Sequence, residues 1–349
     1  MTQLLAPPRQ PVAELQARYL PDVMRWLRDV LPGSEPGLSQ LLRYHMGWED
    51  VGGTARPTSS GKALRPILCL TACELAGGDW HAALPAAAAL ELVHNFSLIH
   101  DDIQDGDATR RGRETVWSIW GLPAALAGGN AMRVIAERTL TRLEDTGVSP
   151  ASVAIASAEL TRGYLDMIEG QYLDLSFEHR QYVPVADYLG MISRKTGALF
   201  ESAMFLGSLV ATDDIDIARA FGATGRGMGI AFQVRDDYLG VWGDPDTMLK
   251  PAADIKRKKK SLPIVHMLER AGGDDRAWLG EAYADDQISG PNVERILDLL
   301  ERLNVRHYVE RTAQATASDA LASGTGLCLT HEQQRVLQDI AWYFVTREK

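Results

Sequence analysis

The feature of this sequence that most constrains its fold is the spacing of its apolar residues, which recur every three to four positions along most of the chain. This spacing is that of one face of an α-helix, and it runs through residues 84–105, 151–178, 185–211 and 215–242. Val, Ile and Thr nowhere show the clean alternation between turn residues that is typical of strands. Several segments are apolar on more than one face, which indicates helices inside a large bundle. The sequence therefore predicts an all-α fold.

The breaks between the helical segments are mostly short, and none has the composition of an interdomain linker. A length of 349 residues allows one large domain or two of average size. The short breaks favour a single domain covering residues 1–349, with residues 1–12 flexible at its start.

Composition narrows the class of protein. The net charge of −10 does not suit a nucleic-acid binder, because phosphate neutralisation needs a basic face. We find no apolar stretch near the roughly 20 residues that span a bilayer. The start of the chain has no charged segment followed by an apolar run, as a secretory signal would. We therefore expect a cytoplasmic protein that does not span a membrane.

The first candidate site is an acidic cluster at the end of an apolar run, with Asp101, Asp102 and Asp105 within five residues. On a helix Asp101 and Asp105 share a face, and Asp102 lies about 100° around the axis. Like charges at this spacing repel, and at a helix C-terminus they also oppose the helix dipole. Hard divalent cations would compensate both effects, with Mg²⁺ binding one or two carboxylates plus substrate phosphate. The alternative interpretation of this cluster alone is a solvated acidic turn.

A second apolar run ends in the same way, at Asp236 and Asp237. Two such helices can face each other across a bundle, where carboxylate metal sites are known. Basic residues gather around both pairs, and together with metal ions they indicate a site for a polyanion such as diphosphate. They are Arg110 and Arg111 after the first pair, Lys250 and residues 256–260 after the second, and Lys62, Arg65 and Lys195 elsewhere. The lysine-rich run 256–260 alone would be read as a solvated loop.

These residues resemble the trans-isoprenyl diphosphate synthase family, also called polyprenyl synthetases. The resemblance covers roughly residues 55–270 and rests on six motifs in order. They are GKALRP, ELVHNFSLIHDDIQDGDATRRGRETVW, EGQYLDLSFE, RKTGALF, FQVRDDYLG and the D-x4-K-x-S-L-P pattern of residues 254–263. The resemblance implies an isoprenoid synthase-type bundle around a central cavity, a homodimer, and three Mg²⁺ ions held by the aspartate motifs. It also implies the reaction, in which isopentenyl diphosphate attacks an allylic carbocation formed when an allylic diphosphate loses its leaving group.

The family's roles transfer residue by residue onto matching positions. The metal ligands or their close partners are Asp101, Asp102, Asp105, Asp236 and Asp237, and Asp101, Asp102, Lys195, Gln233 and Asp236 are the expected catalytic residues. Arg110, Lys195, Thr196, Gln233, Lys250 and Lys259 match positions that hold the allylic diphosphate. Lys62, Arg65, His94 and Arg111 match those that hold isopentenyl diphosphate. Without the family, His94 would be read as a core histidine.

Five positions depart from the family's pattern, one of them Leu249, where Gly often precedes the lysine. Ala63 stands where the family often has Arg, and Gly240 replaces the last Asp of the second motif. Asn130 and Arg133 stand in a segment that commonly reads like GDALF. These changes leave room for a specialised relative.

Product length is expected to depend on the helix that ends at Asp101, where Phe96 and Ser97 lie about one turn below the carboxylate. An aromatic ring beside a small residue resembles geranylgeranyl (C20) synthases, so C20 is the predicted product. Farnesyl (C15) or longer-chain synthesis, and a class I terpene cyclase on the same fold, remain as alternatives. An HD-type phosphohydrolase would need more histidines, and a non-catalytic subunit would be expected to lose motif aspartates.

Overall fold

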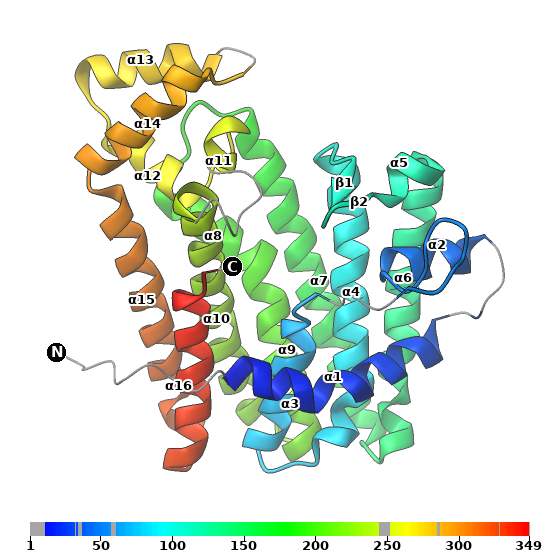
Figure 1. Cartoon of the computed structure of the whole chain (residues 1–349). Coiled ribbons are helices and arrows are strands. Elements are labelled where there is room, and N and C mark those ends of the chain that lie inside the picture. The colour runs from blue at the N-terminus through cyan, green and yellow to red at the C-terminus, as the bar shows by residue number, and fades with distance from the viewer. Residues whose placement is uncertain are drawn as a thin grey trace. The chain divides into compact units, whose positions relative to one another are not determined.

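The computed structural model describes residues 11–31, 33, 37–56, 61–243, 252–284, 287–327 and 329–348. Helices make up most of these residues, so the all-α prediction is confirmed (Figure 1). The described residues form two compact units, one within Val12–Arg162 and Ser202–Gly222 (the N-terminal unit) and one within Gly163–Glu201 and 223–348 (the C-terminal unit). The prediction of one domain for the whole chain stays a prediction. Of the segment expected to be flexible, residues 1–10 lie outside the described residues, whereas Val12 is buried in the first helix.

The N-terminal unit holds the first half of the chain. Its elements are α1 (Pro11–Val30), α2 (Leu38–His45), α3 (Leu64–Leu75), η1 (Trp80–Ala83), α4 (Leu84–Gln104), β1 (Thr109–Arg110), β2 (Arg113–Glu114), α5 (Val116–Trp120), α6 (Leu122–Thr141) and η2 (Arg142–Thr146), with parts of α7 (Pro150–Glu178), α9 (Ala198–Thr212) and α10 (Ile215–Trp242).

The centre of the N-terminal unit is α4, which packs against α3 and α6. Because α4 is apolar around most of its circumference, its first ten residues are buried. Glycines let α6 approach closely: a Cβ at Gly129 would lie 2.3 Å from the His100 Nε2 atom. The segment Trp80–Gln104 is long and apolar enough to cross a membrane, which corrects the expectation that no stretch comes near that length. Since 78% of its most apolar window is buried, it has the character of a core helix and is weak evidence for a membrane span.

A short hairpin follows α4, with Arg110 opposite Arg113 and Thr109 opposite Glu114. Its two turn residues, Arg111 and Gly112, have φ angles of 52° and 73°. Positive φ at both turn positions is typical of the type I′ hairpins whose twist matches that of the strands. These strands were not predicted from the sequence, because Arg rarely adopts the left-handed conformation that the turn requires.

The C-terminal unit contains the remaining elements. They are the rest of α7, α9 and α10, with α8 (Val185–Ile192), the π-helix η3 (Ser193–Gly197), α11 (Ala253–Lys256), α12 (Leu262–Arg270), α13 (Gly273–Ala284), α14 (Gly290–Arg302), α15 (Val305–Ser323), η4 (Gly324–Leu327) and α16 (His331–Thr346). Helices α15 and α16 run side by side (Figure 1). Its core gathers apolar side chains from α8, α10, α12, α14 and α15.

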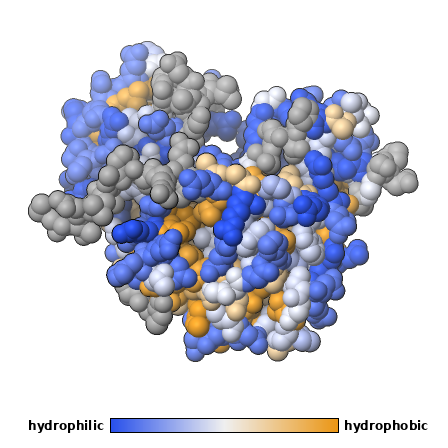
Figure 2. Space-filling model, turned by 60° about the horizontal axis from the view of Figure 1, so that its bottom comes forward, coloured by the Kyte–Doolittle hydropathy of each residue, from blue (hydrophilic) through white to orange (hydrophobic). Residues whose placement is uncertain are grey.

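Not every apolar side chain is buried. Figure 2 shows hydrophobic areas between hydrophilic ones on the face that it presents. Three large apolar residues of α6, namely Leu122, Leu126 and Val134, are 49%, 40% and 45% exposed. Their spacing of four and eight residues puts them along one side of the helix.

Candidate active site

The first aspartate motif is organised by one arginine. Arg110 Nε donates to Asp102 Oδ1 at 2.6 Å, and its Nη2 donates to Asp101 Oδ2 at 3.0 Å. Asp102 is buried, whereas the Asp101 side chain is 23% exposed. Burial raises the pKa of Asp102, and the Arg110 guanidinium opposes that rise. The hairpin thus places Arg110 against the carboxylates of both Asp101 and Asp102.

Asp105 caps the C-terminal end of α4 and is exposed. It lies one turn beyond Asp101, as the helical spacing predicts. The first motif therefore offers two solvent-accessible carboxylates and one that is buried against a guanidinium.

A cavity of about 130 Å³ lies beside this motif in the N-terminal unit. Its walls include Arg56, Arg110, Arg111 and Arg113, with Gly61 at the edge. A Cβ at Gly61 would lie 2.7 Å from Arg111 Nη2, so only glycine allows this guanidinium to lie against the GKALRP segment. Glu91, Asp102 and Glu114 also line this space, so the four arginines leave a small excess of positive charge, which suits an anion.

Two of the other residues predicted to hold isopentenyl diphosphate lie near this cavity. Burial lowers the pKa of His94 well below its usual value, and the nearby positive charges of Arg65 and Arg111 lower it further. His94 is therefore neutral at pH 7, and the cations Arg65 and Arg111 lie near it. Lys62 accepts a hydrogen bond from Gln16 Nε2 through its backbone carbonyl at 2.9 Å.

Backbone strain accompanies the predicted diphosphate-binding residues. Ala63 has a φ of 44°, Arg111 of 52° and Lys258 of 54°. Arg111 is itself a predicted anion-binding residue, and Ala63 and Lys258 are next to two others, Lys62 and Lys259. Non-glycine residues in the left-handed region cost energy and tend to occur at functional sites. The departure at Ala63 therefore falls on a strained position that opens α3.

The second motif, in the C-terminal unit, separates its two aspartates. Asp237 is buried, and its carboxylate accepts hydrogen bonds from Tyr188, from Gln233 Nε2 at 3.1 Å and from Leu262 N at 3.0 Å. Burial raises the pKa of Asp237 to about 7, although the positive charge of Lys259 opposes this. Its surroundings favour a structural role, with Asp237 fixing α8, α10 and α12 to one another.

Asp236 points to the surface, and its side chain is 40% exposed. Its Oδ1 accepts a hydrogen bond from Arg347, whose own side chain is only 5% exposed. Arg347 also donates to the Phe232 carbonyl at 3.3 Å and lies 4.0 Å from the centre of the Phe232 ring. Thus the end of α16 holds one oxygen of the exposed second-motif carboxylate.

The RKTG motif forms the π-helix η3, a rare element that is often found at functional sites. Lys195 Nζ contacts Asp174 Oδ2 at 2.5 Å, and Thr196 Oγ1 donates to Gln233 Oε1 at 2.8 Å. Gln233 in turn donates to Asp237, so Thr196, Gln233 and Asp237 form one chain of hydrogen bonds. Two of the residues predicted to hold the allylic diphosphate, Thr196 and Gln233, are thereby joined to the second motif.

At Gly240, where the family's second motif has an Asp, the carboxylate of Asp254 lies close by. A Cβ at Gly240 would lie 2.4 Å from Asp254 Oδ2, so the Asp254 carboxylate lies directly against this glycine. Burial raises the pKa of Asp254, while the nearby Lys259 charge lowers it. Lys259 is exposed, whereas Lys260 is buried over the ring of Tyr283. Lys250 lies outside the described residues.

The predicted chain-length residues lie on the interior side of α4. Phe96 is 4% exposed, and its ring meets that of His100 edge to face at a centroid distance of 5.1 Å. Ser97 is half-buried and donates to the carbonyl of His94 at 2.7 Å. Of the departures on α6, Asn130 is exposed, and Arg133 pairs with Glu137 at 2.9 Å, one helical turn away.

Sequence reasoning missed several residues of these networks. Asp174 lies within the quoted motif EGQYLDLSFE, and its carboxylate one turn beyond Gly170 was the available signal. Glu91 also lies within a quoted motif; it is buried near Arg65 and Arg111, with Asn95 Nδ2 donating to its Oε1 at 3.1 Å. Nothing in the sequence pointed to Arg347, because it lies 111 residues from Asp236.

The donors available suit Mg²⁺. Among the described residues no three His, Cys, Asp or Glu side chains lie together as a metal site. Mg²⁺ commonly uses one or two carboxylates and completes its shell with water and substrate phosphate. Exposed oxygens of Asp101 and Asp105 in the N-terminal unit, and separately of Asp236 in the C-terminal unit, are ligands of this kind.

Comparison with known proteins identifies the family. The family model for polyprenyl synthetase matches residues 55–300. The (2E,6E)-farnesyl diphosphate synthase of Mycobacterium tuberculosis is 35% identical over 97% of this chain and 93% of its own length. The geranylgeranyl diphosphate synthase of the same organism is 38% identical over 82% of this chain and 81% of its own length. The crystal structure of a polyprenyl synthetase from Streptomyces coelicolor superposes with a TM-score of 0.87 at 32% identity, covering 95% of this chain and 99% of that one.

The chain therefore belongs to the polyprenyl synthetase family. Its fold is the all-α isoprenoid synthase fold, and it is a prenyltransferase that elongates prenyl chains.

Proposed function

We propose that this enzyme condenses isopentenyl diphosphate with an allylic diphosphate in a Mg²⁺-dependent reaction and releases geranylgeranyl diphosphate. The observation that carries this proposal is the arginine-lined cavity beside the first motif. A terpene cyclase needs one diphosphate site, at the metal motifs. Arg111 in this cavity, together with neutral His94 and the cation Arg65 near it, supports a second anion site in the N-terminal unit.

The residues divide between two substrates. Lys62, Arg65, His94 and Arg111 bind the diphosphate of isopentenyl diphosphate. The allylic diphosphate is held by Arg110, Lys195, Thr196, Gln233, Lys250 and Lys259. Arg supplies planar paired donors and Lys supplies point charges, so both kinds suit phosphate oxygens.

The exposed carboxylates of Asp101, Asp105 and Asp236 hold Mg²⁺, and Asp102 and Asp237 act as their buried partners. When bound, the metal supplies Lewis-acid neutralisation of the leaving diphosphate. The chain's own cations stabilise the same developing charge, which is a large term in a site shielded from water. The Asp102 carboxylate keeps Arg110 oriented while it does so.

The proposed product is C20. The buried ring of Phe96 beside the small Ser97 supports a floor of moderate depth below Asp101. The farnesyl synthase that aligns with 97% of this chain favours C15 as the second candidate. Phe96→Ala decides whether this ring limits the product. We expect it to shift the products of a labelled isopentenyl diphosphate assay to longer chains, and an unchanged distribution would contradict that role.

We also propose that the enzyme works as a cytoplasmic homodimer. The exposed stripe of Leu122, Leu126 and Val134 on α6 supports self-association, because such residues favour burial against a second copy. Sedimentation of the protein at micromolar concentration tests this directly: a dimer is expected, and a monomer would contradict it.

Product analysis tests the reaction itself. The enzyme is supplied with Mg²⁺, isopentenyl diphosphate and a C5, C10 or C15 primer in turn, and the products are separated by chain length. Formation of geranylgeranyl diphosphate from each primer supports the proposal. Release of a hydrocarbon from geranylgeranyl diphosphate alone would support the cyclase instead.

A further inference from the structure

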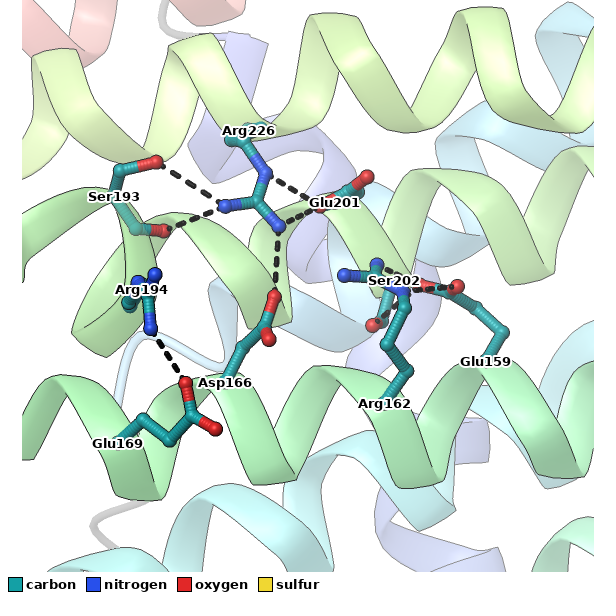
Figure 3. A network of polar contacts seen from close by, with 9 residues as sticks. All are labelled: Glu159, Arg162, Asp166, Glu169, Ser193, Arg194, Glu201, Ser202 and Arg226. Atoms are coloured by element: carbon teal, nitrogen blue, oxygen red, sulfur yellow. Dashed lines mark hydrogen bonds and ion pairs between the residues drawn. The ribbon is translucent and has the colours of Figure 1, made fainter. Parts of the chain in front are cut away.

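An arginine outside the motifs, Arg226, donates hydrogen bonds to the first residue of the π-helix η3. Arg226 lies on α10, and its Nη1 atom donates to the carbonyl oxygen of Ser193 at 3.3 Å and to Ser193 Oγ at 3.2 Å (Figure 3). Ser193 is the first residue of η3. A π-helix interrupts the regular hydrogen-bond ladder of the neighbouring α-helices, so an outside donor to its carbonyls helps to fix its shape.

The same guanidinium is anchored on two other helices. Arg226 Nε donates to Glu201 Oε2 at 2.6 Å on α9, and Nη2 contacts Asp166 Oδ2 at 3.0 Å on α7 (Figure 3). One planar side chain thus joins α7, α9, α10 and the start of η3. Only Arg presents donors in a fork that reaches several acceptors at once.

The backbone of η3 packs closely against α7 and α10, so it can move only if those helices move too. A Cβ at Gly170 of α7 would lie 2.2 Å from Lys195 N, and one at Gly229 of α10 would lie 2.9 Å from Gly197 Cα. Glycines on both sides therefore let α7 and α10 press against the π-helix. If α7 or α10 shifts, the backbone that carries Lys195 and Thr196 shifts with it.

Removal of Arg226 would leave two carboxylates facing each other. Asp166 and Glu201 would each lose their contact with this guanidinium, and the repulsion between them would favour separation of α7 from α9. The side chains involved are each about a quarter exposed, at 27% for Arg226 and Asp166 and 22% for Glu201. Partly exposed ion pairs contribute little to global stability, so the main consequence falls on the geometry of η3.

We propose that Arg226 is a positioning residue that sets Lys195 and Thr196 for the allylic diphosphate by holding the π-helix at Ser193. It touches neither substrate. This inference rests on the proposed function, in which Lys195 and Thr196 bind that diphosphate. Nothing in it concerns isopentenyl diphosphate, whose predicted residues lie in the N-terminal unit.

The test compares Arg226→Gln and Arg226→Lys with Arg162→Gln. Arg162 is a matched control because it is also an arginine in an ion pair. It contacts Glu159 at 2.6 Å, both residues lie on α7, and no hydrogen bond from Arg162 to η3 is seen in the described residues. The KM of each substrate is measured separately, and inorganic diphosphate with Mg²⁺ is titrated calorimetrically. Thermal melting shows whether each variant is folded.

Arg226→Gln is expected to raise the allylic KM and the Kd of inorganic diphosphate by about tenfold, the effect of losing one charge-assisted hydrogen bond. The KM of isopentenyl diphosphate should stay close to that of the wild type. Arg226→Lys should fall between, and Arg162→Gln should match the wild type. An unchanged allylic KM, or an equal rise for both substrates, would overturn the proposal. Absence of turnover in the wild-type enzyme would contradict the proposed function. The titration of inorganic diphosphate would still test whether Arg226 positions the diphosphate-binding residues.

Discussion

The two aspartate motifs lie near the C-terminal ends of two long helices, α4 and α10, with the same Asp-Asp pair, yet the structure surrounds them differently. In both pairs the second aspartate is buried and the first is more exposed. Asp102 is compensated by the charge of Arg110, only eight residues away. Asp237 accepts hydrogen bonds from Tyr188, from Leu262 and from Gln233 on its own helix, and the charge of Lys259 also counters the effect of burial on its pKa. The first motif is thus compensated by one arginine close by in the sequence, whereas most partners of the second motif come from distant segments.

The difference in exposure within each pair predicts that the reaction depends on the exposed carboxylates, Asp101 and Asp236. Asp101→Ala and Asp236→Ala each remove a solvent-accessible ligand, and each should lower kcat by at least about a thousandfold, as expected for loss of a main electrostatic element. Circular dichroism should show that both variants remain folded. Retained turnover in either variant would contradict the role of that motif.

The next effect concerns stability. Arg110→Met leaves the buried Asp102 without its cation and should lower the free energy of unfolding by about 3 kcal/mol. Arg347→Met leaves Asp236 at a 40% exposed position, where solvent screening should limit the loss to under about 1 kcal/mol. Urea unfolding at pH 7 measures both. Equal losses would show that the two motifs are compensated in the same way.

The Arg110→Met loss should also depend on pH. Without the guanidinium, burial raises the pKa of Asp102 further above its unfolded value. A carboxyl with a raised pKa in the folded state loses stability as pH rises above its unfolded pKa. The difference from wild type should therefore be larger at pH 8 than at pH 5. The opposite trend would contradict the pairing of Arg110 with Asp102.

A smaller effect comes from the cations that crowd the first motif. Burial lowers the pKa of His45 to about 3, and the charges of Arg110, Arg111 and Arg113 contribute, while Asn95 opposes them. A group with a lowered pKa adds stability above its unfolded value, and that stability is lost as pH falls below about 6.5. Between pH 7 and pH 5 the wild type should lose about 2 kcal/mol more than His45→Gln. Parallel pH profiles for the two proteins would show that His45 is not held neutral.

The sequence predicted the helical fold and the family because both rest on local patterns. Helical spacing and the six motifs are readable along the chain, and they brought Thr196, Gln233 and Asp237 into one set before their hydrogen bonds were known. The 100° step of a helix indicated that the two aspartates of a pair face different ways. It did not indicate which one points inward, because that depends on the packing of other helices.

The remaining features depend on contacts between distant segments. Arg347 reaches Asp236 across 111 residues, and Arg226 reaches Asp166 across 60. The hairpin was missed because its turn uses Arg111 in a conformation that favours glycine. Gly240 was read as a lost ligand, whereas the structure shows a carboxylate of Asp254 against it.

We propose that the arginine-lined cavity beside the first motif serves a second diphosphate substrate. Steady-state kinetics of Arg111→Gln with isopentenyl diphosphate and an allylic primer tests it most directly. A selective rise of the isopentenyl diphosphate KM, with the allylic KM near that of the wild type, is the predicted result. Equal KM values for the wild type and the variant, or turnover of an allylic diphosphate without consumption of isopentenyl diphosphate, would contradict the account.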